Sequence, residues 1–201
     1  LETLSHVLID GRCLRQYSLP VQGTPGQADL REFIDQGVWA ISTVYSYLAT
    51  TGDISLLDEV VGYHQASPAD ENAMVPASER DTVLEHLLRI MDYLSAQRDS
   101  ETNLVLALYG DWNDALDGLG ISSDPEKQFG SGVSVMTSLQ FYQCCTEMIE
   151  ILRSHSSEQH TAQVAKFEEL KRQLCQGLLE FAIVEQEGQR KILHGWGDER
   201  S

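Results

Sequence analysis

Apolar residues recur every three or four positions along several long stretches of this chain. The clearest stretches lie at about 30–49, 83–96, 135–152 and 164–181. Such spacing places the apolar side chains on one face of a helix, and that face is normally buried against another helix. Short turns and longer polar loops separate the stretches. The pattern therefore predicts an all-α protein of antiparallel helices, with its functional loops gathered on one side.

Shorter elements are expected between these helices. Residues 1–9 have the pattern of the last turns of a helix, which Asp10-Gly11 ends. Residues 54–61 predict a short helix. Residues 64–78 contain two prolines and several acidic and small residues, and predict an exposed loop. Near the C-terminus, Lys191-Ile192-Leu193 indicates a strand.

The chain has 201 residues and a formal net charge of −17 at pH 7. This length suits one domain, which we place at residues 1–201. A strongly acidic chain is a poor partner for nucleic acid or for an anionic membrane, and no apolar run is long enough to span a bilayer. The first residue is Leu rather than Met, so we expect a fragment of a longer chain.

Cysteine and histidine spacing argues against a metal or redox site. The four cysteines lack Cys-x-x-Cys spacing, and Cys144 and Cys145 fall within an apolar helical pattern, which favours a place in the core. Reduced thiols in a cytoplasmic protein fit this usage best. His194, beside Trp196, is a candidate site residue. The other five histidines show no ligand spacing with one another, so the sequence predicts no metal site.

Residues 108–120 have a composition that no helix favours. The stretch combines three aspartates, a tryptophan and an asparagine with three glycines: Asp111, Trp112, Asn113, Asp114 and Asp117, between Gly110, Gly118 and Gly120. Asp and Asn compete with the backbone for hydrogen bonds, and Gly ends helices. An indole offers a flat apolar face on which a sugar ring packs, and carboxylates supply acceptors or a proton. The stretch therefore predicts an ordered loop that forms a site.

Two other interpretations of this loop remain open on the residues alone. Asp-Gly and Asn-Asp are common in solvated turns that have no function. A calcium loop beginning at Asn113 would place Asp117 and Gly118 suitably. However, Ala115 stands at the third position of that loop, where a calcium ligand is usual, and Asp124 stands at the last position, where Glu is usual.

The string Gly-Asp-Trp-Asn-Asp at 110–114 resembles the signature of glycoside hydrolase family 94. This family contains inverting phosphorylases of cellobiose, chitobiose and β-1,2-oligoglucans. Further likenesses follow in the family's order, at Asp35 to Trp39, at Thr51-Gly52-Asp53, at 132–135 and at Trp196-Gly197-Asp198. The chain departs from the family pattern at Gln36, where a second Asp is usual, and at Val133, where Glu is usual.

The resemblance implies both a fold and an activity. Family members carry an (α/α)6 barrel within a much longer chain, so residues 1–201 would be a fragment of that barrel and inactive alone. The implied reaction is reversible phosphorolysis of a β-linked disaccharide or oligosaccharide, with inversion, to an α-sugar 1-phosphate. Inorganic phosphate would be the co-substrate, without a cofactor, and the parent enzyme would form a homodimer. An inverting hydrolase of the same fold and a non-catalytic carbohydrate-binding helical module are the alternatives.

The resemblance also suggests roles for individual residues. Asp114 matches the general acid and must hold its proton near neutral pH, which burial or a neighbouring carboxylate such as Asp111 would favour. Trp112 is expected to line a sugar subsite, although a Trp that anchors the loop has the same pattern. Asn113 would orient a carboxylate or hold the turn.

Three residues outside the loop are further substrate-binding candidates. Asp35 and Trp39, at the start of a predicted helix, are expected to point into the same cavity as the loop. A capping Asp beside a core Trp is the alternative. Arg12 is expected to contact an anion or a sugar, although a surface arginine without a ligand is the common case.

Overall fold

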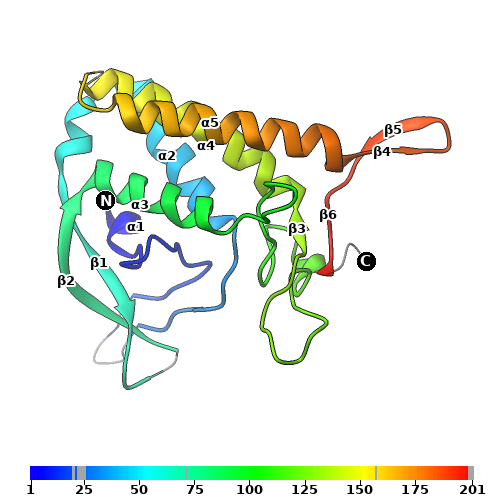
Figure 1. Cartoon of the computed structure of the whole chain (residues 1–201). Helices are drawn as coiled ribbons and strands as arrows, with labels where there is room; N and C mark the ends of the chain where they lie inside the picture. Colours follow the sequence, from blue (N-terminus) through cyan, green and yellow to red (C-terminus); the bar gives the residue numbers. More distant parts are fainter. Residues whose placement is uncertain (20, 22–25, 71, 157, 199–201) are drawn as a thin grey trace. The chain divides into compact units, whose positions relative to one another are not determined.

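The computed structural model describes residues 1–19, 21, 26–70, 72–156 and 158–198. The chain forms two compact units, Leu1–Tyr93 and Leu94–Ser201 (Figure 1). The single domain expected over residues 1–201 therefore stays a prediction. In the described part of the chain, no helix has both the length and the apolar content needed to cross a bilayer.

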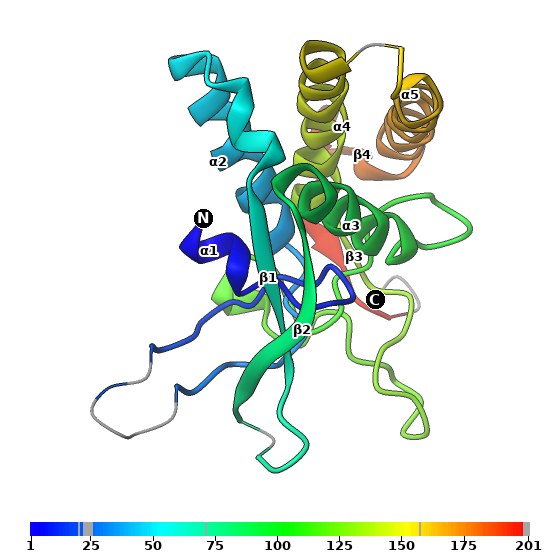
Figure 2. The same ribbon diagram turned by 90° about the vertical axis from the view of Figure 1, so that its left-hand side faces the viewer.

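Unit 1 combines helices with a long β-hairpin. Its elements are α1 (Glu2–Ser5), α2 (Gln36–Thr51), the 3-10 helix η1 (Ile54–Asp58), β1 (Val60–Ala66), β2 (Met74–Thr82) and the start of α3 (Val83–Ala96). β1 and β2 pair antiparallel from Val60–Thr82 to Ala66–Met74, with an irregularity between Gly62 and His64. Figure 2 shows the hairpin as a long twisted ribbon.

The hairpin corrects two predictions. The short helix expected over 54–61 is only the 3-10 helix η1, and the exposed loop expected over 64–78 lies mostly in β1 and β2. Val61 and Tyr63 are buried whereas Val60, Gly62 and His64 are not, which is the two-residue period of a strand. Alternation this short is easily missed beside a helical run.

The all-α prediction is wrong, and so is the (α/α)6 barrel that the resemblance implied. The described residues contain three two-stranded antiparallel sheets, β1-β2, β3-β6 and β4-β5, alongside the helices. The chain is a mixed helix and strand protein. Helical periodicity was correct where it was long, but it gave no information on the segments between the helices.

The long helices predicted from the apolar spacing are confirmed. α2 begins at Gln36, later than the expected residue 30, and ends at Thr51. Gly52, with a positive φ of 70°, forms its left-handed cap. Val38, Ile41 and Leu48 lie on its buried face. α3 covers 83–96 as predicted.

Unit 2 is built around an antiparallel pair of helices, α4 (Val135–Ser156) and α5 (Thr161–Gly177). The two helices run side by side in Figure 1. Their buried side chains include Phe141, Met148, Leu152, Phe167 and Leu174. A π-helical turn, η3 (Leu178–Ala182), continues α5 to the end expected from the sequence.

Short strands complete unit 2. β4 (Ile183–Gln186) and β5 (Gln189–Ile192) form a hairpin whose turn residues, Glu187 and Gly188, both have positive φ. β5 confirms the strand expected near Ile192. β3 (Val133–Ser134) pairs antiparallel with β6 (Gly195–Trp196), which brings the C-terminal segment to the start of α4.

Candidate active site

Asp111 is the buried centre of the Asp-rich loop, with 3% of its surface exposed. Its Oδ2 accepts a 2.5 Å hydrogen bond from the hydroxyl of Ser134. Its Oδ1 accepts a 2.9 Å bond from the backbone N–H of Asn113. Because a buried carboxylate is costly unless it is hydrogen-bonded, these contacts fix both the carboxylate and the turn that follows it.

Ser134 is held in place by the start of α4. Its Oγ accepts a 3.0 Å bond from the N–H of Thr137, as an N-cap does, and its carbonyl accepts a 2.7 Å bond from the hydroxyl of Ser138. The Ser138 hydroxyl in turn accepts from the N–H of Val105 at 2.9 Å. All four of these residues are buried. Asp111 is thus attached to a rigid helix terminus.

His194 contacts the other side of the same carboxylate. Its Nε2 lies 3.4 Å from both oxygens of Asp111. The Asp111 side chain is 1% exposed and that of His194 is 36% exposed. The sequence marked His194 only as a candidate beside Trp196, and Ser134 only as part of the family-like string at 132–135.

Asp114 and Trp112 lie on the outer side of the loop. Trp112 is 67% exposed, and Asp114 is exposed at the start of the short 3-10 helix η2 (Asp114–Leu116). Asn113 is half-buried between them. Burial therefore separates the two acids: Asp111 is an internal anchor and Asp114 faces outward. The burial that was expected to favour a protonated Asp114 is not found in this chain.

Glycines let the surrounding loops approach one another closely. A Cβ on Gly120 would lie 2.4 Å from the backbone N and O of Leu108, and one on Gly132 would lie 2.6 Å from the carbonyl oxygen of Leu119. The N–H of Gly118 also bonds the carbonyl of Tyr109 at 2.5 Å. The close approach at Gly120 and the positive φ of 88° at Gly118 account for two of the three glycines that marked residues 108–120.

Asp198 anchors the loop that follows. Its carboxylate accepts bonds from the N–H groups of Ser123 and Ser131, both at 2.8 Å. The hydroxyls of Ser122, Ser123 and Ser131 donate to it at 3.0–3.1 Å. These hydrogen bonds, led by the two backbone N–H groups, hold the pKa of Asp198 well below its usual range. The sequence had marked Asp198 only as part of a family-like string.

Asp35 and Trp39 form a second pair, in unit 1. Asp35 is buried, and its two oxygens accept 2.8 Å bonds from Nε1 of Trp39 and Nε2 of Gln36. Trp39 is 47% exposed and lines a hollow of about 540 Å³, which includes His6 and Tyr17. The role of both residues in substrate binding remains a prediction.

The guanidinium of Arg12 is engaged inside unit 1. Nη1 donates to the carbonyl of Leu30 at 3.0 Å and lies 4.0 Å from a carboxylate oxygen of Glu32. Nε of Arg12 is buried without a hydrogen-bond partner. These contacts give Arg12 a structural role, and its predicted contact with a sugar or an anion stays a prediction.

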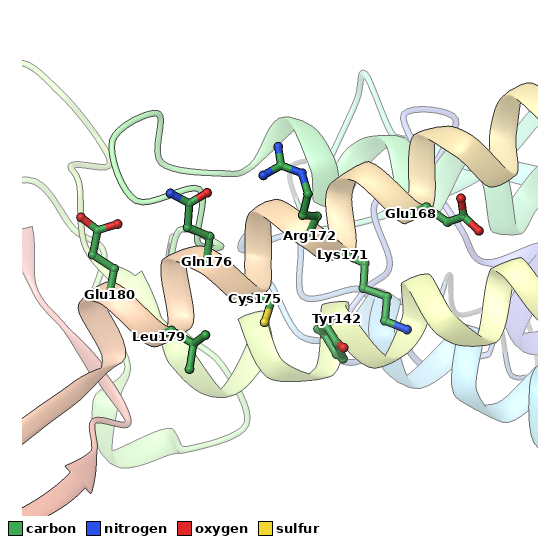
Figure 3. Close-up of a pocket in the computed structure, with 8 residues that line it drawn as sticks. All are labelled: Tyr142, Glu168, Lys171, Arg172, Cys175, Gln176, Leu179 and Glu180. Carbon is green, nitrogen blue, oxygen red and sulfur yellow. The ribbon is translucent and has the colours of Figure 1, made fainter.

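A hollow of about 720 Å³ lies between α4 and the α5–η3 segment, as Figure 3 shows. Nζ of Lys171 lies 5.1 Å from the centre of the Tyr142 ring at this hollow. Its charged lining groups are two acids, Glu168 and Glu180, and two bases, Lys171 and Arg172. None of the residues predicted for the site line it.

Neither the cysteines nor the acidic loop forms a metal site among the described residues, where no group of three His, Cys, Asp or Glu side chains is placed to hold an ion. All four cysteines are free, and Cys144 and Cys145 are buried in α4 as predicted. Burial raises the pKa of Cys145 to about 12.

Comparison with known proteins agrees with the loop signature. The sequence profile of the glycosyl hydrolase 94 superfamily, catalytic domain, matches residues 16–181. This chain belongs to that family. The matched range contains Asp35, Trp39 and the 110–114 signature, and leaves Arg12, His194 and Asp198 outside.

Named relatives of this glycosyl hydrolase 94 chain are phosphorylases. Solabiose phosphorylase of Paenibacillus borealis is 38% identical over 152 residues, which are 76% of this chain and 16% of that protein. N,N'-diacetylchitobiose phosphorylase of Vibrio furnissii is 27% identical over 119 residues, which are 59% of this chain and 12% of that protein. The chain thus spans 12–16% of the length of these relatives.

Proposed function

We propose that this chain is the part of a longer glycoside phosphorylase that carries the proton donor, Asp114. The reaction would be reversible phosphorolysis of a β-linked disaccharide or oligosaccharide, with inversion, to an α-sugar 1-phosphate. The observation that carries the proposal is the anchored loop. In a member of this family, Asp111 is buried and fixed, while Asp114 and Trp112 on the same loop face outward.

In this mechanism Asp114 donates its proton to the glycosidic oxygen while the bond from that oxygen to the anomeric carbon breaks. A phosphate oxygen forms the new bond to the anomeric carbon from the opposite face, which inverts the configuration. An inverting hydrolase needs a second carboxylate to activate water. Phosphate is already an anionic nucleophile, so one acid is sufficient, and the proton of the attacking hydrogen phosphate restores Asp114.

The exposed indole of Trp112 supports a carbohydrate substrate, because a flat apolar ring beside polar groups suits the apolar face of a sugar. The relatives named for solabiose and N,N'-diacetylchitobiose support a disaccharide. We assign phosphate contacts to parts of the longer protein outside this chain. A homodimeric, cytoplasmic parent enzyme remains part of the proposal.

The test measures release of sugar 1-phosphate from β-linked disaccharides by the full-length protein, with and without inorganic phosphate. Cleavage that requires phosphate and yields the α-anomer supports the proposal. Cleavage at the same rate without phosphate would assign the hydrolase alternative. Binding of disaccharide without cleavage under either condition would assign the non-catalytic alternative.

A further inference from the structure

We infer that the segment His194–Asp198 positions the acid-bearing loop, with His194 and Asp198 as positioning residues for the reaction. This inference rests on the proposed function for its kinetic consequence, but its structural consequence is independent of it. Both residues lie beyond the range matched by the family profile, residues 16–181.

The backbone of the segment is attached at the start of α4. Gly195 and Trp196 pair with Ser134 and Val133. The carbonyl of His194 also accepts bonds from the N–H groups of Val135 at 2.9 Å and Met136 at 3.3 Å. These are among the first N–H groups of a helix, which lack partners within it. The segment therefore completes the same helix terminus whose Ser134 holds Asp111.

The side chain of His194 faces Asp111 directly. Asp111 receives the Ser134 hydroxyl at 2.5 Å, the Asn113 N–H at 2.9 Å and the His194 imidazole at 3.4 Å. The N–H of Asn113 joins this carboxylate to the residue that precedes Asp114. A displacement of Asp111 would therefore be passed to the proposed acid through one peptide unit.

Asp198 fixes a second loop at the other end of the segment. Five donor groups of Ser122, Ser123 and Ser131 converge on its carboxylate. This second loop is joined to the acid loop at Gly120, whose carbonyl accepts the N–H of Gly130 at 2.9 Å. His194 and Asp198 are four residues apart. His194 thus contacts the acid-bearing loop, and Asp198 holds the loop that follows it.

Glycines at positions 130 and 195 let these segments approach one another closely. A Cβ on Gly130 would lie 2.2 Å from the carboxyl carbon of Asp198, and a Cβ on Gly195 would lie 2.4 Å from the carbonyl oxygen of Val133. At Gly195 the added Cβ would meet a backbone atom, so a larger residue does not fit there. At Gly130 it would require the Asp198 side chain to move away from the serines. The fit indicates that the three segments are placed by one another.

The test uses the full-length protein with H194A, H194Q and D198N. H194A removes the imidazole, whereas H194Q keeps an N–H donor that reaches Asp111. D198N replaces one acceptor oxygen with a donor amide facing N–H and O–H groups. Two matched controls lie on α4 and α5: H155Q, a half-buried histidine, and E169Q, an exposed carboxylate that accepts bonds from Arg172 and Gln173.

Kinetics and amide hydrogen exchange are measured together. Because misplacing a catalytic group by about 1 Å costs on the order of 100-fold, we expect H194A and D198N to lower kcat about 10- to 100-fold with KM little changed. H194Q is expected to recover most of kcat, and the two controls to match wild type. Exchange should rise at 109–116 in H194A and at 121–132 in D198N.

Three results would overturn the inference. The first is unchanged hydrogen exchange at both loops in H194A and D198N. The second is a loss of kcat in H194Q as large as that in H194A. The third is a loss of kcat in the controls H155Q and E169Q as large as that in H194A and D198N. A wild-type protein without phosphorolysis would instead count against the proposed function. In that case the exchange measurement still decides whether the two loops depend on His194 and Asp198.

Discussion

The hydroxyl of Ser134 donates a 2.5 Å hydrogen bond to the carboxylate of Asp111, a buried acid 23 residues earlier in the chain. The same Oγ caps α4 by accepting the N–H of Thr137. One side chain therefore joins the most regular element of unit 2 to the loop that carries Asp114. This pairing explains how a loop rich in Asp and Gly is held in one conformation.

Ser134→Ala tests this pairing directly. The variant removes a helix cap and leaves a buried carboxylate with one donor fewer, so we expect a loss of about 1–3 kcal/mol in the free energy of unfolding. Chemical denaturation followed by far-UV circular dichroism measures it. Ser154→Ala, at an exposed position on the same helix, is the control. Equal stability of the two variants would contradict the anchoring role of Ser134.

Asp114→Asn separates catalysis from folding. Because Asp114 is exposed, the free energy of unfolding should change by no more than about 0.5 kcal/mol. Loss of the proton donor should lower kcat of the full-length protein by at least about 100-fold. Phosphate-dependent release of sugar 1-phosphate is the measurement, and Asp117→Asn is the control at a turn position. Wild-type turnover by Asp114→Asn would refute the assignment of the acid.

Gly120→Ala tests the close packing of the loops. The added Cβ would lie 2.4 Å from backbone atoms of Leu108, which cannot move as a flexible side chain does. We expect destabilisation of about 1–3 kcal/mol or more, measured by the shift of the denaturation midpoint. Gly62→Ala is the matched control, because its nearest neighbour is the end of the Arg80 side chain at 4.0 Å. If Gly120→Ala is as stable as wild type, the chain around Gly120 can move away from Leu108, and the close packing is not required.

The acid stability of the protein should depend on Asp198. Hydrogen bonds to the ionised carboxylate lower its pKa in the folded state, so its contribution is fully present above the usual pKa of Asp, about 4. That contribution is lost as the pH falls through the lower, folded-state pKa. Asp198→Asn should therefore be less stable than wild type at neutral pH, and the difference should shrink on acidification below about pH 4. Urea denaturation at a series of pH values measures it, and a difference independent of pH would contradict the explanation.

Only one of the four thiols should react rapidly in the native protein. Cys175 is exposed on α5, and Cys144 and Cys145 are buried. Burial raises the pKa of Cys13 and of Cys145 to about 12 in each case, which leaves little reactive thiolate at neutral pH. Titration with a chromogenic disulfide reagent should give one fast equivalent, and Cys175→Ser should remove it. Several fast equivalents in the wild-type chain would contradict the low reactivity expected of the half-buried Cys13 and the buried Cys144 and Cys145.

Local sequence patterns predicted the long helices well and the segments between them poorly. α3, α4 and α5 follow the apolar spacing because each helix presents one buried face over many turns. The β1–β2 hairpin was missed, because only Val61 and Tyr63 of its strands are buried and β2 carries three charged residues in succession, Glu79, Arg80 and Asp81. That omission produced the incorrect all-α prediction.

The sequence by itself determined the helices of unit 2, the family, and the loop on which the proposed acid lies. These depend on the spacing of apolar residues close together in the chain and on the unusual composition of residues 110–114. Both can be seen in the sequence without knowledge of the fold. Only the tertiary structure decided that Asp111 is an anchor and that Ser134, His194 and Asp198 hold the loops. His194 and Asp111 are 83 residues apart, and Asp198 and Ser123 are 75 apart. Such contacts arise when β6 pairs with β3, and no local preference of the chain encodes that pairing.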